Sequence, residues 1–209
     1  MIFKGNLFVI SGPSGVGKDA ILERLLELVP NLVKSVSFTT RPKRLGEVEG
    51  KSYYFTDENT FKEMVEKGEF LEWAVVHGYL YGTPKRIIEE LVNKGIDVIL
   101  KIDVQGGINV KKIYDKAILI FILPPDFEEL KRRLISRETE DLRDLEIRLK
   151  NAPLEISKIS YYDYAVINDN LEDAVDRVKS IIIAERHKLC RQKVEYFLKL
   201  FGGEFNERT

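Results

Sequence analysis

The sequence has little of what several classes of protein require. Its 209 residues include one cysteine, Cys190, which excludes an internal disulfide and a cysteine-rich metal site. A single cysteine is typical of the reducing cytosol, and we expect a cytoplasmic protein. The N-terminal apolar run is interrupted by Gly5 and Asn6 before it reaches the length of a signal peptide or a membrane span. We therefore expect no membrane partner.

Strong charge of one sign is also missing. The formal net charge is -1 and hydrophobic residues make up 44% of the chain, which argues against disorder and against general binding of nucleic acid. A chain of this length can bury a full core, so we expect one globular unit or one core with insertions.

One stretch near the N-terminus fits the phosphate-binding template of Gly, four residues, Gly and Lys. It follows the apolar run from Leu7 to Ile10 and precedes a helical pattern, as the template requires. Glycines let the backbone turn tightly and aim its N–H groups at a polyphosphate, beside a helix N-terminus. The predicted phosphate-binding loop consists of Gly12, Pro13, Ser14, Gly15, Val16, Gly17 and Lys18, and the family resemblance given below implies that its ligand is ATP.

The residue after Lys18 departs from this template. Asp19 stands where Ser or Thr would place a hydroxyl on Mg²⁺. A carboxylate can also ligate Mg²⁺, but it adds a negative charge that a hydroxyl does not. Asp19 is thus a candidate for ATP binding and for holding the metal.

Apolar strands alternate with helical patterns in most of the chain. We expect strands at 7–10, 96–102, 117–123 and 164–167. Helices are expected at 21–29, 107–113, 127–135 and 171–201, the last in one or two pieces. Near-continuous apolar strands separated by helices predict an α/β fold whose parallel sheet is covered on both faces.

Two segments interrupt this core, which we assign to residues 1–33, 85–136 and 153–209. Residues 34–84 read as a small α+β insertion, with short strands at 36–39, 53–56, 70–74 and 77–81 and a helix at 58–67. We expect Trp73 to be part of a core. Residues 137–152 are dense in charge and would suit a mobile helical lid.

Arg41 and Arg44 place two guanidiniums in one short segment of the insertion. Arginine forks match phosphate oxygens in pairs, so these residues could hold a second phosphate that faces the one in the loop. A solvated loop is the alternative reading. Tyr53 and Tyr81 could each add a hydroxyl, although aromatic residues in strands are more often core.

With these motifs the sequence resembles the guanylate kinases. The resemblance runs from about residue 8 to about residue 192 and includes GPSGVGK, SFTTRPKR, GEVEGKSYYF, GEFLEW, YGTP, KIDVQG, FILPP and VIND. It implies a P-loop kinase that uses ATP with Mg²⁺ to phosphorylate GMP, giving ADP and GDP. Such an enzyme would serve guanine nucleotide metabolism and GMP recycling.

The resemblance also implies roles for single residues. Those that would bind the phosphate of GMP are Arg41, Arg44, Tyr53 and Tyr81. Those that would read guanine are Ser37, Glu72, Thr83 and Asp103. Glu72 has an independent rationale, because a carboxylate can accept from the adjacent N1–H and N2–H₂ donors of guanine, a pair that adenine lacks. Without the resemblance, a surface carboxylate would be the better reading.

Three further arginines, Arg133, Arg137 and Arg148, match family positions around the ATP phosphates, and Asn168 matches a position near the adenine. Phosphoryl transfer is catalysed mostly by positioning and charge neutralisation, which converging cations provide. An ordinary charged helix face is the alternative for any one of the arginines. The expected catalytic residues are Lys18, Arg41, Arg133, Arg137 and Arg148.

Two departures from the family pattern belong together. The family has Ser or Thr at the position of Asp19, and Asp at the position of Lys101. We hypothesise that Asp19 pairs with Lys101 and that Asp19 or an intervening water serves the metal. The exchange makes the site one charge unit more positive, so weaker dependence on free Mg²⁺ would follow. The alternative is independent drift in an enzyme that has lost activity.

Two other functions stay open from the sequence. One is a catalytically silent guanylate-kinase-like domain that binds proteins, for which Asp19 and Lys101 are the only support. The other is a kinase for a different nucleotide or a phosphorylated sugar, against which Glu72, Ser37 and Thr83 favour guanine.

Overall fold

The computed structural model describes residues 4–76, 78–136, 142–189 and 194–202. Its centre is a five-stranded sheet in the order β2-β7-β1-β8-β9, in which all neighbouring strands are parallel. The strands are β1 (Leu7–Ser11), β2 (Leu32–Lys34), β7 (Asp97–Lys101), β8 (Ile118–Leu123) and β9 (Tyr164–Ile167). The predicted α/β class with a parallel sheet flanked by helices is confirmed.

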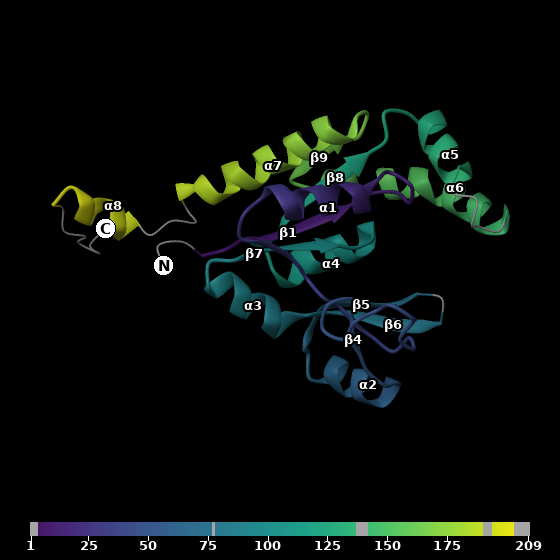
Figure 1. The fold of residues 1–209 in the computed structure, drawn as a ribbon, viewed down its shortest axis with the longest axis horizontal. Helices are drawn as coiled ribbons and strands as arrows, with labels where there is room; N and C mark the ends of the chain where they lie inside the picture. Colours follow the sequence, from purple (N-terminus) through teal and green to yellow (C-terminus); the bar gives the residue numbers. More distant parts are fainter. Residues whose placement is uncertain (1–3, 77, 137–141, 190–193, 203–209) are drawn as a thin grey trace.

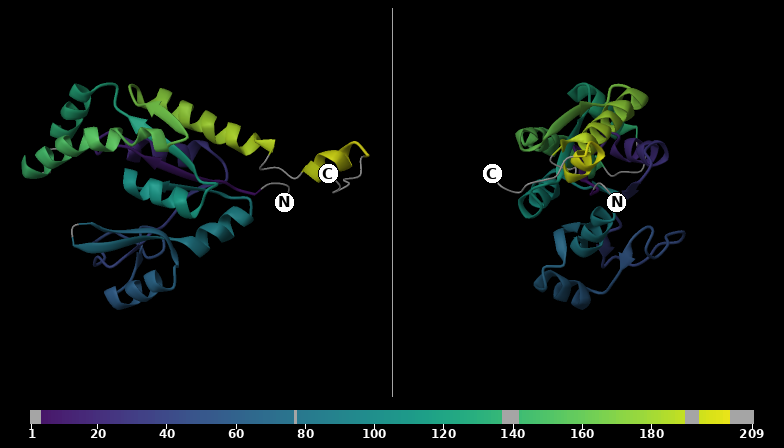
Figure 2. Two further views of the ribbon diagram at one scale, coloured as in Figure 1. Left: turned by 180° about the vertical axis from the view of Figure 1, so that it is seen from behind. Right: turned by 90° about the vertical axis from the view of Figure 1, so that its left-hand side faces the viewer.

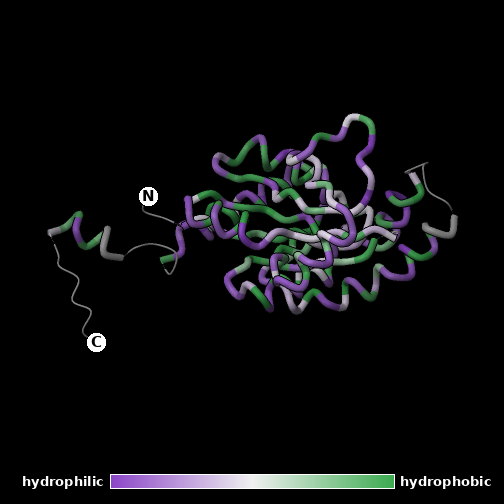
Figure 3. Tube along the Cα trace, turned by 90° about the horizontal axis from the view of Figure 1, so that it is seen from below, coloured by the Kyte–Doolittle hydropathy of each residue, from purple (hydrophilic) through white to green (hydrophobic). Residues whose placement is uncertain are grey.

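Helices cover both faces of this sheet (Figure 1). One face carries α1 (Lys18–Leu28), α5 (Phe127–Ile135) and α7 (Leu171–His187), and the other carries α3 (Lys85–Asn93) and α4 (Val104–Ile113). Side chains of β1 alternate between the two layers, as the period of a strand requires: Phe8 and Ile10 join one core cluster, Leu7 and Val9 the other. In Figure 3 the trace through the centre of the molecule is largely hydrophobic, and hydrophilic residues are more frequent in the segments around it.

A second, smaller sheet lies below the core in Figure 1, and Figure 2 shows the same arrangement from two further sides. Its order is β4-β3-β6-β5, formed by β3 (Phe38–Thr39), β4 (Tyr54–Phe55), β5 (Phe70–Val76) and β6 (Tyr79–Pro84). The helix α2 (Glu58–Glu66) packs on it through Phe61, whose ring stacks on Phe70 at 4.6 Å between centroids. We call this part of the chain the lobe, residues 35–84.

Some sequence predictions were wrong or incomplete. Trp73 is 47% exposed, because it lies on the edge strand β5 and on the same side of that strand as the exposed Val75. The edge strand β2 and the helix α3 were not predicted. The helix predicted at 107–113 starts at Val104, because Asp103 caps it by accepting from the N–H of Gly106 at 3.0 Å. Residue 77, where a strand was expected to begin, lies outside the described residues.

The part of the chain expected to form a lid is only partly described. Residues 137–141 lie outside the described residues, and the following segment forms α6 (Leu142–Ile156), which a short 3₁₀ turn follows (Ile159–Tyr161). The last helical pattern comes in two pieces, α7 and α8 (Val194–Leu200), and α8 lies beyond the end of α7, away from the sheet (Figures 1 and 2). Among the described helices, none has the length and apolar character needed to cross a membrane.

Candidate active site

The loop between β1 and α1 depends on glycine at two tight points. Gly12 has φ 149°, and a Cβ there would lie 2.2 Å from the carbonyl oxygen of Ile122. Gly17 has φ 92°, and its Cβ would lie 2.5 Å from the side-chain nitrogen of Asn168. Both positions therefore require glycine for conformation and for space. The result is the strand-loop-helix geometry that the template predicts.

Lys18 reaches back across this loop. Its ammonium donates to the carbonyls of Gly12 at 2.6 Å and Pro13 at 2.8 Å. The charge is thus held over the loop, at the N-terminus of α1, where the helix dipole also favours an anion.

Residues far along the chain hold the same loop. The buried side chain of Asn168, just after β9, donates to the carbonyl of Val16 at 2.7 Å. Arg133 on α5 donates to the carbonyl of Asn168 at 3.0 Å and pairs with Glu129 at 2.6 Å. The structure thus places Asn168 and Arg133 beside the loop.

Arg148 joins this group from α6. Its Nη1 donates to the hydroxyl of Ser14 at 2.7 Å, so a cation of the expected lid touches the loop directly. Arg137, the third arginine predicted here, lies outside the described residues.

Asp19 and Lys101 are in contact. The Lys101 ammonium at the end of β7 donates to the Asp19 carboxylate at the start of α1, so the hypothesised ion pair is present. Burial alone would raise the pKa of Asp19. The hydrogen bond from Lys101 and the charges of Lys101, Lys18 and Lys34 outweigh burial, so this pKa lies below its usual value. Asp19 therefore stays ionised at neutral pH.

This ion pair bears on how a metal could be held. The carboxylate proposed as a metal ligand already accepts from Lys101, and Lys101 carries a positive charge where the family pattern has a carboxylate. Within residues 4–76, 78–136, 142–189 and 194–202, no group of three or more His, Cys, Asp or Glu side chains could hold a metal ion.

The lobe contributes a buried guanidinium. Arg41 is 8% exposed, pairs with Glu47 at 2.5 Å and donates to the carbonyl of Pro42 at 2.8 Å. Its guanidinium lies 5.5 Å from the ring centre of Tyr53. The hydrogen bond that Arg41 donates to Glu47 raises the pKa of Arg41, burial works against this, and Tyr81 adds to the rise. The structure thus brings Arg41, Tyr53 and Tyr81 together.

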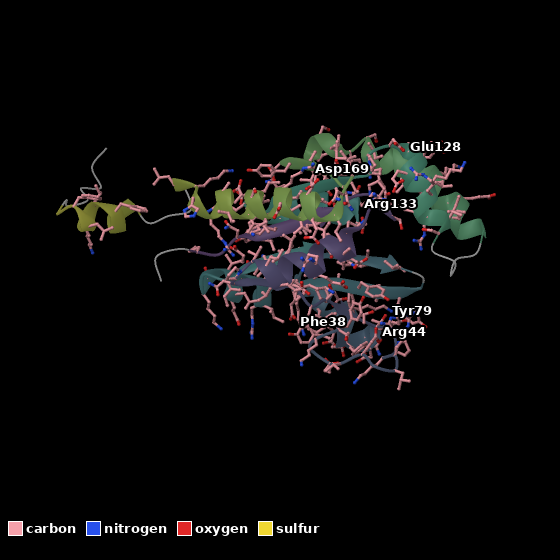
Figure 4. The ribbon with its side chains drawn as sticks, turned by 45° about the horizontal axis from the view of Figure 1, so that its top comes forward. Phe38, Arg44, Tyr79, Glu128, Arg133 and Asp169 are labelled. Atoms are coloured by element: carbon pink, nitrogen blue, oxygen red, sulfur yellow. The ribbon has the colours of Figure 1, made fainter. Side chains whose placement is uncertain are left out.

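Arg44 belongs to the same segment. Its backbone N–H donates to Glu47 at 2.8 Å, so one carboxylate fixes both the Arg41 side chain and the Arg44 backbone. Figure 4 shows Arg44 and Tyr79 on the lobe and Arg133 on the core, all toward the same end of the molecule. Cations from the two parts of the chain therefore lie at one end.

Glu72 and Asp103 meet between the lobe and the core. Thr83 donates to Glu72 at 2.5 Å, and a Cβ built on Gly106 would lie 3.4 Å from a carboxylate oxygen of each acid. Burial raises the pKa of Glu72, and the charge of Asp103 adds to the rise while the hydrogen bond from Thr83 lowers it. Ser37, the fourth residue predicted to read guanine, lines a small cavity with Tyr53, Thr83 and Lys101.

A model of the guanylate kinase family matches residues 4–185 of the chain. The chain belongs to the guanylate kinase family. A guanylate kinase of Thermotoga maritima is 50% identical over 196 residues, covering 93% of this chain and 95% of the relative. One from Clostridium tetani is 49% identical over 199 residues, covering 95% of each. The crystal structure of a guanylate kinase from Anaplasma phagocytophilum superposes with a TM-score of 0.75 at 37% identity, covering 99% of this chain and 100% of that one.

The structure adds two acids to the candidate site that the sequence prediction missed. Glu47 braces the arginines of the lobe. Glu155 lies on α6 at helical spacing from Arg148 and Ala152, on the face toward the loop. Burial raises the pKa of Glu155, the charge of Lys18 lowers it and that of Asp103 raises it. The seven-residue spacing from Arg148, which is about two helical turns, was the only signal in the sequence that could have indicated Glu155.

Proposed function

We propose that this protein transfers the γ-phosphoryl group of ATP to GMP, giving ADP and GDP, and so recycles GMP within guanine nucleotide metabolism. The observation that carries this proposal is the pairing of two cationic sites on separate parts of the chain. Lys18 and Arg148 lie at the loop of the core, and Arg41 lies in the lobe beside two tyrosines. Family membership makes ATP and GMP the expected pair of substrates.

The donor site is the loop of residues 12–18. Backbone N–H groups and Lys18 would hold the ATP phosphates, as in other phosphate-binding loops. Arg133 and Arg148 would approach the outer phosphates from α5 and α6, and Asn168 would fix the loop while lying near the adenine. Mg²⁺ would arrive bound to ATP.

The acceptor site is built on the lobe. Arg41, Arg44, Tyr53 and Tyr81 would bind the phosphate of GMP. Glu72 would accept from the two adjacent N–H donors of guanine, and its hydrogen bond with Thr83 fixes the orientation of the carboxylate. Ser37, Thr83 and Asp103 would complete the recognition of the base.

The chemistry requires no side-chain nucleophile. A phosphate oxygen of GMP attacks the γ-phosphorus of ATP, the bond to the β-phosphate oxygen breaks, and ADP leaves. Lys18, Arg41, Arg133 and Arg148 would neutralise the charge on the transferred group, together with Arg137 outside the described residues. Closure of the lobe and lid around both substrates would exclude water and prevent hydrolysis of ATP.

A coupled assay of ADP release tests this proposal. The purified protein is mixed with Mg·ATP and GMP, AMP or UMP in turn, and GMP binding is measured separately by calorimetry. We expect turnover with GMP and at most background release with AMP and UMP. Turnover with another acceptor would replace GMP by that substrate. GMP binding without turnover would instead support the catalytically silent domain.

A further inference from the structure

Lys101 lies close to both parts of the chain that are proposed to bind a substrate. It ends β7, and its register partner on β1 is Ile10, next to the start of the phosphate-binding loop. Parallel strands present their carboxyl ends at one edge of the sheet, where ligands bind in open α/β folds. Lys101 is therefore a neighbour of the donor site by topology.

The side chain of Lys101 confirms this placement in space. Its ammonium contacts Asp19, the residue that follows Lys18. The charges of Lys18 and Lys34 also lower the pKa of Asp19. Lys101 also lines a cavity with Ser37, Tyr53 and Thr83 of the lobe. Lys101 thus adjoins both the loop expected to bind ATP and the residues expected to bind GMP.

A cation at this point has a chemical task. The transferred phosphoryl group carries charge on its outer oxygens, and fixed positive groups stabilise that charge as it develops. An ammonium has three N–H donors, so Lys101 can keep its contact with Asp19 while donating to a phosphate oxygen. Lys101 is 29% exposed and Asp19 63%, so a ligand can approach this pair.

The geometry points to Lys101 as a phosphate-contacting cation of the donor site, positioned by Asp19, that supplies part of the charge neutralisation otherwise left to the divalent cation. This inference rests on the proposed function for the identity of the triphosphate. It assigns Asp19 a positioning role in place of a metal ligand. It also explains with one physical reason why positions 19 and 101 both differ from the family pattern.

Binding of ATP without metal tests the inference directly. Calorimetric titrations in excess EDTA compare the wild type with Lys101→Met and Lys101→Arg. We expect Lys101→Met to weaken metal-free ATP binding about tenfold or more, because one charge-assisted hydrogen bond is lost. Lys101→Arg keeps the charge and should stay within about threefold of the wild type. The charge-matched control is Lys62→Met on α2, an exposed residue paired with Glu58.

Restoring the family pattern tests the role of the pair. Asp19→Ser combined with Lys101→Asp should increase the ratio of ATP affinities with and without Mg²⁺ about tenfold or more over the wild-type ratio. The effects of the two single changes should be non-additive, because the residues are in contact. Circular dichroism and the unfolding midpoint show whether each variant is folded.

Two outcomes would overturn the inference. One is wild-type affinity of Lys101→Met for metal-free ATP, and the other is an unchanged metal dependence in the double variant. Failure of the proposed function is distinguishable from both, since it shows as absent GMP turnover in the wild type while these binding differences persist.

Discussion

Both ends of the proposed reaction use a cation held by a carboxylate, but the two pairs differ in rigidity. In the lobe, Arg41 is 8% exposed, and Glu47 fixes its fork together with the Arg44 backbone. At the loop, Lys101 and Asp19 are 29% and 63% exposed, and each brings a single flexible side chain. The comparison shows that the Arg41–Glu47 pair, at the proposed GMP site, is preorganised, whereas the Lys101–Asp19 pair, at the proposed ATP site, is accessible to a ligand.

The largest expected effect is a loss of activity when the donor end is changed. Lys18→Met removes the ammonium that spans the loop and should lower kcat/KM for ATP by about 10³-fold, because charge on the transferred group loses a fixed donor. Steady-state ADP release measures this effect. The control is Lys62→Met, which changes net charge equally on the far side of the lobe and should leave kcat/KM within about twofold of the wild type. Wild-type activity of Lys18→Met would contradict the assignment of the loop as the ATP site.

A change at the rigid end should act on GMP alone. Arg41→Lys keeps the charge but loses the planar fork, so we expect the KM for GMP to rise about tenfold or more. The KM for ATP should stay near its wild-type value. Arg86→Lys on α3, an exposed residue paired with Glu90, is the matched control. Equal rises in both KM values would show that the sites are not separate.

The lobe should also respond to pH. Burial and the charge of Asp103 raise the pKa of Glu72, and the hydrogen bond from Thr83 only partly offsets them. Only the ionised carboxylate accepts both guanine donors, so acidification should raise the KM for GMP. The rise should begin at a higher pH than for an exposed glutamate, and GMP binding in this range should release a proton.

Kinetics between about pH 5 and pH 8 measure this dependence. Glu72→Gln should bind GMP more weakly at neutral pH, because its amide nitrogen faces the donors of guanine, and should lose most of the pH dependence of KM. A wild-type KM that is flat across this range would contradict the role of Glu72.

The smallest expected effect lies in the support of the loop. Asn168→Ala leaves the carbonyl of Val16 without its buried donor and should lower the free energy of unfolding by about 1 to 2 kcal/mol. Urea unfolding measures it. Asn59→Ala, on the exposed face of α2, should change the free energy by less than about 0.5 kcal/mol. Equal losses in the two variants would show that the contact with Val16 does not stabilise the fold.

The sequence predicts the core better than the site. Buried strands such as β8 can be recognised in the sequence, because a strand between two helical layers is a continuous run of apolar residues. The edge strand β2 has three residues, too few for a pattern. Trp73 was misplaced because aromatic residues on an edge strand can stay exposed, which only the strand order reveals.

The site shows the same limit. The spacing of residues 12–18 predicts the loop, and two departures from the family pattern suggested the contact of Asp19 with Lys101. Glu47 was not predicted, although its partner Arg41 is only six residues away, because it is one acid among many in a charged loop. Glu155 was not predicted because the charges around it, Lys18 and Asp103, come from distant parts of the chain. Charged residues carry no periodicity that marks such contacts.

The central claim is that core and lobe each bind one nucleotide. Separate calorimetric titrations with Mg·ATP and with GMP test it on the wild type, Lys18→Met and Glu72→Gln. The account predicts that Lys18→Met loses affinity for ATP, while its affinity for GMP stays within about threefold of the wild type. Glu72→Gln should lose affinity for GMP, while its affinity for ATP stays within about threefold of the wild type. Loss of both ligands in either folded variant, or loss of neither, would contradict the account.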